Sequence, residues 1–316
     1  MPTLLDPWDP HRPIPLTGWL ERHRFSPAIV FVLITIVAFV AYVAVSNVLT
    51  LVMLFARGVT IAELQGNLSG VVAEQLRPMF VANSMAQFLV LGIPALFLAR
   101  LHTPDGRAYL RLRMPDSRLL GLSVLCYLCA FPLIQWVASL NAAIPIPDAL
   151  QAWEASQLML IEAISEQQVG IVFSLLTVAV TPAICEELIF RGYLQRNLDR
   201  VVPAAVSIII IGILFGVYHL RFSQVLPLSA LGVYFAYVTW RTGSLWPAIL
   251  IHFIHNGAMV LLGQYIQQSD TISAEQVEQM VIPWYVIAIC IGGVALLAKL
   301  MQQRAERLIQ ARRQLA

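Results

Sequence analysis

The sequence contains few charged residues and few cysteines. Charged side chains make up 12% of the 316 residues, against about 25% in typical soluble domains. Hydrophobic residues make up 59%, and the mean hydropathy is +0.74. This composition leaves no room for a separate soluble domain and indicates an integral membrane protein. The four cysteines do not suggest a disulfide framework, because the C-x-x-C pair Cys126 and Cys129 lies within an apolar run, where two small buried side chains are favoured over a redox or metal pair.

The apolar residues gather in eight runs that are long enough, or nearly so, to cross about 30 Å of hydrocarbon as helices. They lie near 27–55, 78–99, 118–140, 169–191, 203–220, 224–240, 245–266 and 281–300. The predicted fold is therefore an all-α polytopic membrane bundle of about eight transmembrane helices within residues 27–300. A polar N-terminal arm, 1–26, precedes the bundle, and a basic tail, 301–316, follows it.

Two connections between these runs contain no Lys or Arg. They are 141–168 and 267–280, whereas basic residues gather in the N-terminal arm, the 100–118 connection, the segment after the fourth run and the tail. Because cytoplasmic connections carry the excess of Lys and Arg, both termini are predicted to be cytoplasmic. With no recognisable targeting peptide, a bacterial cytoplasmic (inner) membrane is the expected location. Topology accounts for the net charge of +2, so no nucleic-acid partner is expected.

Two adjacent glutamates interrupt the fourth run, in the stretch Thr181-Pro-Ala-Ile-Cys-Glu-Glu-Leu-Ile-Phe-Arg191. An ionisable side chain at membrane depth costs roughly 2.5–3.5 kcal/mol on insertion scales and marks a functional site by default. Glu187 and Arg191 are four residues apart on one helix face, so they are predicted to form an ion pair. Glu186 points about 100° away and is predicted to be the free carboxylate that acts as a base.

A histidine ends the fifth run. Phe215 lies one turn before His219 on the same face, and Gly212 and Gly216 keep this helix slim enough for another helix to approach closely. The depths of the two polar positions do not agree at once. Glu186 is expected near the cytoplasmic end of the fourth span, whereas His219 lies roughly 24 Å along the fifth if that helix is straight.

The seventh run carries a histidine and an asparagine four residues apart, His252 and Asn256. They present an imidazole and an amide on one face, and two neutral donors on one face are what an oxyanion hole requires. His255 borders the same face and is a candidate supporting partner.

These residues together resemble the CAAX protease and bacteriocin-processing (CPBP, or Abi) family of glutamate-type intramembrane endopeptidases. The resemblance covers about residues 165–265 and is carried by three segments, which are Glu186-Glu-Leu-Ile-Phe-Arg-Gly-Tyr-Leu194, Leu214-Phe-Gly-Val-Tyr-His219 and Thr242-Gly-Ser-Leu-Trp-Pro-Ala-Ile-Leu-Ile-His252-Phe-Ile-His-Asn256.

The resemblance implies a role for each motif residue. Glu186 and His219 would activate a water for peptide hydrolysis, and His252 and Asn256 would stabilise the tetrahedral oxyanion. Glu187 and Arg191 would hold the site in place. The substrate would be a membrane-associated peptide or protein, either prenylated and CAAX-like or of the bacteriocin type.

Three alternatives stay open at this stage. The sequence lacks His-Glu-x-x-His, and no cofactor is expected, but Glu186, His219 and His252 could also bind zinc with one open position. A proton-coupled transporter would use the same residues as a relay, although no internal repeat is visible. A non-catalytic membrane scaffold is the third alternative.

Overall fold

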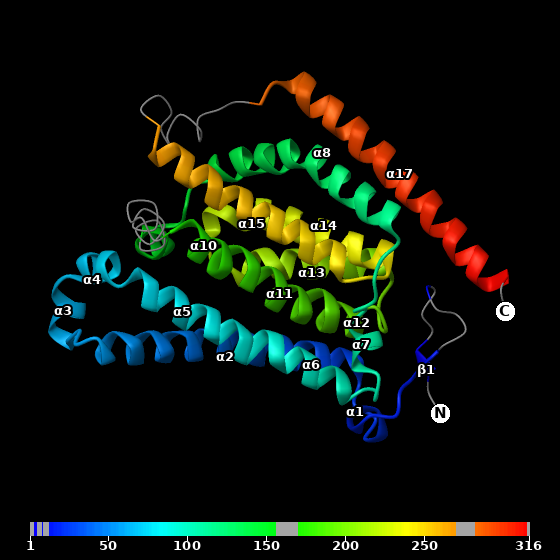
Figure 1. The fold of residues 1–316 in the computed structure, drawn as a ribbon, viewed down its shortest axis with the longest axis horizontal. Helices are drawn as coiled ribbons and strands as arrows, with labels where there is room; N and C mark the ends of the chain where they lie inside the picture. Colours follow the sequence, from blue (N-terminus) through cyan, green and yellow to red (C-terminus); the bar gives the residue numbers. More distant parts are fainter. Residues whose placement is uncertain (1–2, 5–7, 9–12, 156–169, 270–281, 315–316) are drawn as a thin grey trace.

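The computed structural model describes residues 3–4, 8, 13–155, 170–269 and 282–314. It is a bundle of helices, with one two-stranded antiparallel pair in the N-terminal arm (Figure 1). In that pair β1 (Thr3–Leu4) lies beside β2 (Ile14–Pro15).

Seven helical stretches are long and apolar enough to cross a membrane in the part of the chain that is described. Four of them are single helices, namely α2 (Pro27–Ala56), α8 (Ser117–Ala142), α15 (Trp246–Gln267) and α17 (Trp284–Gln314). The stretch Leu76–Arg100 consists of α5 (Leu76–Ala86), η1 (Gln87–Gly92) and α6 (Ile93–Arg100), and the stretch Phe222–Thr242 consists of η4 (Phe222–Gln224) and α14 (Val225–Thr242). The stretch Ile171–Leu198 consists of α10 (Ile171–Ser174), η2 (Leu175–Val180), α11 (Thr181–Glu187), η3 (Leu188–Leu194) and α12 (Gln195–Leu198). Short helices connect them, namely α1 (Trp19–Arg22), α3 (Ile61–Gly66), α4 (Leu68–Glu74) and α7 (Gly106–Tyr109). The chain is a multi-pass membrane protein, as its composition predicted.

The fifth of the eight expected spans differs from the prediction. Helix α13 (Ala204–Tyr218) has 15 residues, which at 1.5 Å per residue make about 22 Å, less than the roughly 30 Å hydrocarbon layer. It packs closely on α14 because both helices carry glycine at the contact. A Cβ on Gly212 would lie 2.5 Å from the backbone nitrogen of Val233, and one on Gly216 would lie 2.6 Å from the carbonyl oxygen of Val225. The slim face predicted for this helix is confirmed.

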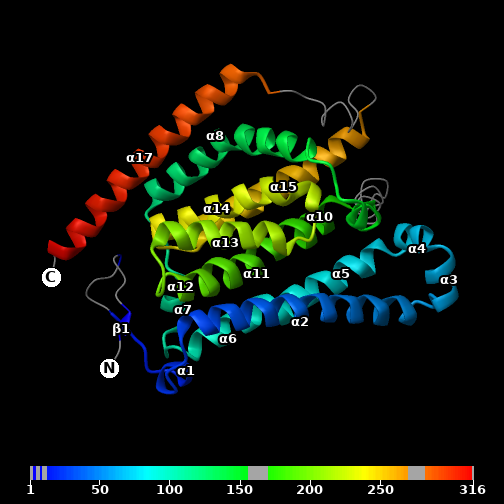
Figure 2. The ribbon, with the colours of Figure 1, turned by 180° about the vertical axis from the view of Figure 1, so that it is seen from behind.

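The helices are arranged in layers (Figures 1 and 2). Helix α2 packs along α5 and η1, and η1 also packs on α11. Helices α13, α14 and α15 follow, and α8 separates them from α17 on the far side. Both termini lie at the same end of the bundle (Figure 1).

The fourth membrane helix resolves the difference in depth. It continues to Leu198, seven residues beyond the predicted end at 191. Glu186 is therefore 12 residues from that end, about 18 Å at 1.5 Å per residue. The expectation that Glu186 lies near the cytoplasmic end of its span is wrong. Its distance of about 18 Å from that end is similar to the length of α13, about 22 Å, so Glu186 and His219 lie at similar depths.

The last membrane helix also runs farther than predicted. Helix α17 continues without a break to Gln314, so the basic segment expected as a separate tail is the end of this helix. Met301 and Ala305 are buried on the bundle, and Arg304 forms an ion pair of 2.8 Å with Asp116 at the start of α8.

A buried polar cluster ties the N-terminal arm to the same end of the bundle. Glu21 of α1 accepts hydrogen bonds from Arg200 at 2.7 and 3.0 Å and lies 2.7 Å from Nδ1 of His102. The other ring nitrogen of His102 lies 3.0 Å from the hydroxyl of Tyr193. Burial of Glu21 raises its pKa, but the bonds from His102 and Arg200 outweigh it and lower the pKa from 4.5 to about 2.

Candidate active site

The two glutamates lie on a helix stretch with unusual turns. The seven-residue helix α11, which ends at Glu187, is flanked by η2 and η3, both π-helical. Wider π turns occur mostly as short insertions within α-helices, frequently at functional sites. The helix is closely packed here, since a Cβ on Gly92 of η1 would lie 3.0 Å from Sγ of Cys185.

Glu187 is the centre of a buried charge cluster. Its Oε1 accepts a hydrogen bond of 2.7 Å from Nη1 of Arg191 and one of 2.9 Å from Nδ1 of His252. Glu187 and Arg191 are 0% exposed and His252 is 3% exposed. Nη2 of Arg191 donates to the carbonyl of Gly232 at 3.1 Å. The ion pair predicted from the four-residue spacing is confirmed, and it joins the fourth span to α14 and α15.

Aromatic rings enclose this cluster. The guanidinium of Arg191 lies 4.2 Å from the ring centroid of Phe215 and 5.1 Å from that of Phe235. The imidazole of His252 stacks on Phe235 at 5.1 Å. Cation–π contacts in desolvated surroundings contribute about 2 kcal/mol, so the rings help to keep a charged group in an apolar bundle.

Glu186 has a different environment from its neighbour. It is 8% exposed, and its Oε2, like that of Glu187, is buried with no hydrogen-bond partner among the described residues. No ion pair of Glu186 occurs within the same residues. The predicted division between a paired and an unpaired glutamate is thus present in the geometry.

His219 caps the end of α13. Its Nδ1 lies 2.7 Å from the carbonyl oxygen of Phe215, and its ring contacts the Phe215 ring at 4.8 Å. Because a carbonyl oxygen can only accept, Nδ1 carries the hydrogen. Nε2 of neutral His219 therefore has the lone pair and can take a proton from water.

The oxyanion-hole prediction needs correction at His252. Its Nδ1 faces the Glu187 carboxylate, which only accepts, so Nε2 of the neutral ring is an acceptor and not the expected donor. His252 can donate to an oxyanion only as an imidazolium, which the adjacent carboxylate would stabilise. One Nδ2 hydrogen of Asn256 goes to the carbonyl of Val178 at 2.9 Å, and the amide has a second hydrogen to donate.

His255, expected beside His252, is turned toward a different helix. Its Nδ1 lies 2.9 Å from the hydroxyl of Tyr127 on α8. It therefore joins α15 to α8, and no hydrogen bond joins it to His252 or Asn256 in the described chain.

Two tyrosines from other helices lie near Glu186, which the sequence did not predict. Tyr42 of α2 and Tyr218 of α13 lie within electrostatic reach of the Glu186 carboxylate, and their rings stack at 5.7 Å. The Tyr42 hydroxyl donates to Asn83 at 2.6 Å. The Tyr218 hydroxyl and Oε1 of Gln87 are buried without a partner among the described residues. Single Tyr, Asn and Gln residues in apolar runs have no diagnostic spacing, so no sequence signal identified them.

The turn that follows His219 is held by a segment from outside the spans. Residues 148–155 are helical, and Glu154, 2% exposed, accepts hydrogen bonds from the backbone nitrogen and hydroxyl of Ser223 at 3.1 and 2.7 Å. Trp153 donates to the carbonyl of Leu220 at 2.8 Å. Leu220 has φ of 52°, a conformation that costs a non-glycine residue roughly 1–3 kcal/mol. The position of His219 thus depends on these contacts.

A three-ligand metal centre is not formed by the described side chains. No three His, Cys, Asp or Glu residues among them come together in a group that could hold a metal ion. The expected alternative set of Glu186, His219 and His252 therefore does not fit a zinc site in this arrangement.

In this multi-pass membrane protein, Glu186, Glu187 and His252 are buried inside the helix bundle, and ionisable groups in that position mark a functional site by default. Residues 168–258 match the family model for type II CAAX prenyl endopeptidase Rce1-like proteins. The matched residues contain the three motifs and agree with the resemblance, and this family match identifies the protein as a peptidase. No curated protein and no solved structure matches the chain.

Proposed function

We propose that this protein is an intramembrane endopeptidase in which Glu186 and His219 activate the hydrolytic water. The observation that carries the proposal is the contrast between the two glutamates. Oε1 of Glu187 is paired with Arg191 and His252, whereas Glu186 forms no ion pair among the described residues and has a buried Oε2 without a partner. An unpaired carboxylate in an apolar bundle is a strong acceptor for a water proton.

The two bases would act together on one water. Glu186 takes one proton from the water, while the lone pair at Nε2 of His219 accepts a hydrogen bond from the other hydrogen and orients the water. The water oxygen attacks the carbonyl carbon of the scissile bond, and the tetrahedral intermediate carries the negative charge on its oxygen. The proton held by Glu186 then passes to the amide nitrogen as the C–N bond breaks, which releases an amine and a carboxylic acid product. The second amide hydrogen of Asn256 and an imidazolium form of His252 would donate to that oxygen.

The substrates would be membrane-associated peptides or proteins. The family description names CAAX prenyl endopeptidases, so a prenylated peptide with a C-terminal CAAX-like sequence is the first candidate. A bacteriocin-type peptide is the second. A bacterial cytoplasmic membrane remains the proposed location, and no metal takes part in the proposed step.

The test is cleavage of a panel of membrane-tethered and prenylated peptides by the detergent-purified protein. Glu186→Ala is assayed in parallel, and each reaction is run with and without a strong chelator. Cleavage that persists with chelator and disappears in the variant supports the proposal. Loss of cleavage with chelator and recovery with added zinc would replace it with the metal-dependent alternative.

Absence of cleavage would bear on the two alternatives that are not peptidases. If neither the wild type nor any variant cleaves a substrate of the panel while all remain folded, the scaffold alternative gains support. Proton-coupled uptake of a solute by reconstituted vesicles, lost in Glu186→Ala, would support the transporter alternative.

A further inference from the structure

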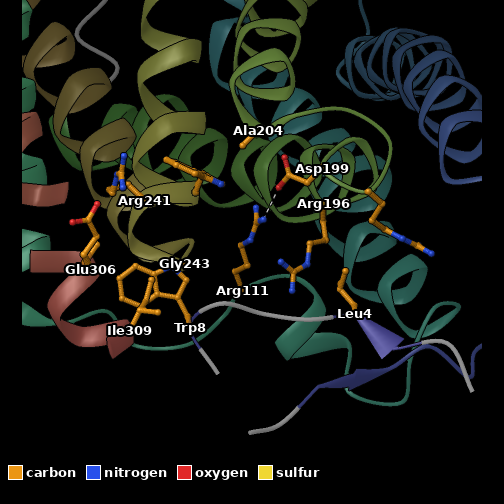
Figure 3. Close-up of a pocket in the computed structure, with 13 residues that line it drawn as sticks. Leu4, Trp8, Arg111, Arg196, Asp199, Ala204, Arg241, Gly243, Glu306 and Ile309 are labelled. Carbon is orange, nitrogen blue, oxygen red and sulfur yellow. Dashed lines mark hydrogen bonds and ion pairs between the residues drawn. The ribbon is translucent and has the colours of Figure 1, made fainter. Parts of the chain in front are cut away.

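A second polar site lies away from the glutamates, at the end of the bundle that holds both termini (Figure 3). It is a cavity of about 270 Å³. Four arginines and two carboxylates line it, together with two tryptophans, and they are Arg111, Arg196, Arg200, Arg241, Asp199, Glu306, Trp8 and Trp240.

The positive charge of this cavity is only partly compensated. Arg200 is engaged by both oxygens of Glu21. Arg111 forms an ion pair of 2.5 Å with Asp199 through Nη2 alone (Figure 3). Arg241 has no carboxylate partner among the described residues, and its guanidinium lies 4.5 Å from the ring of Trp240.

Two of these guanidinium groups retain unused donors. Nη1 of Arg111 and Nε of Arg241 are buried and have no hydrogen-bond partner in the described part of the chain. Arg111 is 6% exposed. A buried donor without an acceptor costs roughly 1–3 kcal/mol, and more when the group is charged. An anion in the cavity would remove this cost with little rearrangement.

The backbone holds Arg111 in position at the cavity. Arg111 has φ of 58°, and its carbonyl accepts a hydrogen bond of 2.9 Å from the nitrogen of Leu245. Nearby, Arg113 donates from Nε to the carbonyl of Gly243 and accepts at its carbonyl from the hydroxyl of Ser244 at 2.6 Å. The loop is thus fastened to the turn between α14 and α15, so the guanidinium is placed before any ligand binds.

We propose that this cavity binds a phosphate group, supplied either by an anionic lipid headgroup or by free phosphate. Phosphate oxygens point in several directions and can accept from guanidinium groups on different sides, and Arg forms paired hydrogen bonds with phosphate. The cavity lies at one end of the membrane helices, where headgroups are within reach, and tryptophans are enriched at that level of membrane proteins. The proposal does not depend on the peptidase mechanism.

The test uses the full-length protein in an uncharged detergent and follows thermal unfolding by tryptophan fluorescence. The protein is titrated with inorganic phosphate against chloride at equal ionic strength, and separately with dihexanoyl phosphatidylglycerol against dihexanoylglycerol, which lacks the phosphate. A ligand that binds the folded state raises Tm in a saturable way. We expect at least one phosphate-bearing probe to do so, and neither control to do so.

Three variants connect this response to the cavity. Arg241→Gln should weaken the apparent affinity about tenfold, the effect of losing one charge-assisted hydrogen bond. Glu306→Gln removes a negative charge from the lining and should strengthen it, by up to about fivefold. Arg307→Gln removes an exposed charge from the same helix end and should change it less than twofold.

The outcomes separate the two sources and can overturn the proposal. Saturation by the lipid but not by phosphate identifies a headgroup, and saturation by both with the same dependence on Arg241 identifies the phosphate anion itself. The proposal is wrong if no probe saturates, or if Arg307→Gln weakens binding as much as Arg241→Gln. If Arg241→Gln does not fold, an unchanged affinity in Glu306→Gln overturns it.

Discussion

Replacing Arg191 tests the buried charge cluster most directly. In Arg191→Met the side chain keeps an unbranched apolar stem, but the Glu187 carboxylate, 0% exposed, loses its guanidinium partner. Removing one partner of a buried ion pair costs about 3–5 kcal/mol, because the other charge stays buried. The contacts of Arg191 with Phe215 and Phe235 are lost as well. Since these contributions are coupled and not additive, we expect a loss of at least about 3 kcal/mol.

A double variant separates stability from activity. Glu187→Gln combined with Arg191→Met contains no buried charge at these positions, and replacing a whole buried pair by neutral groups is often nearly neutral for stability. We expect it to recover at least about 2 kcal/mol relative to Arg191→Met. Its peptidase activity should stay at least about tenfold below that of the wild type, because an imidazolium at His252 no longer has a carboxylate beside it.

Unfolding is measured in micelles by titration with a denaturing detergent, followed by tryptophan fluorescence, and activity by cleavage of a membrane-tethered peptide. Arg307→Met, at an exposed position, is the control and should change stability by less than about 0.5 kcal/mol. The reasoning is refuted if Arg191→Met costs less than about 1 kcal/mol, or if the double variant is less stable than the single one.

Three further perturbations follow from the structure. Tyr218→Phe removes a buried hydroxyl without a partner in the described chain, so stability should not fall; kcat/KM should decrease about tenfold if the hydroxyl contacts substrate, whereas Tyr265→Phe, exposed on α15, should have no effect. Glu154→Ala removes both acceptors of the turn after His219 and should lower kcat about tenfold with KM little changed; equal loss in both parameters, or none, would contradict the positioning role. The pKa of Glu21 is lowered to about 2, so its contribution to stability is full above about pH 4.5 and is lost as pH falls through about 2; unfolding measured across that range should show this loss in the wild type and a smaller one in Glu21→Gln.

Much of the fold could be predicted from the sequence, because membrane helices are specified by long apolar runs. The bounds at polar ends were harder to predict. The fourth span was expected to stop at 191, but Gln195 and Asn197 are 0% exposed and continue the helix inside the protein. Side-chain polarity alone does not show that such residues find partners in the bundle, as Gln195 does at the carbonyl of Ala236.

The candidate site, too, could be predicted only in part from the sequence. The pairing of Glu187 with Arg191 follows from helix geometry and could be predicted. The tautomer of His252 depends on a residue 65 positions away, and the two tyrosines near Glu186 come from separate spans. Such contacts are set by tertiary packing, which residue spacing does not encode.

The short helix α13 has a consequence for the surrounding lipid. Several of its apolar side chains are exposed, including Ile209 at 51%, Ile213 at 50% and Val217 at 51%, so lipid tails lie along a helix about 8 Å shorter than the hydrocarbon layer. Hydrophobic mismatch of this kind is relieved by local thinning of the bilayer. The thinned region would adjoin His219 at the end of this helix, which brings the headgroup level and its water closer to that histidine. The activity of the enzyme should therefore depend on bilayer thickness, and it should be higher in lipids with short acyl chains than in lipids with long ones.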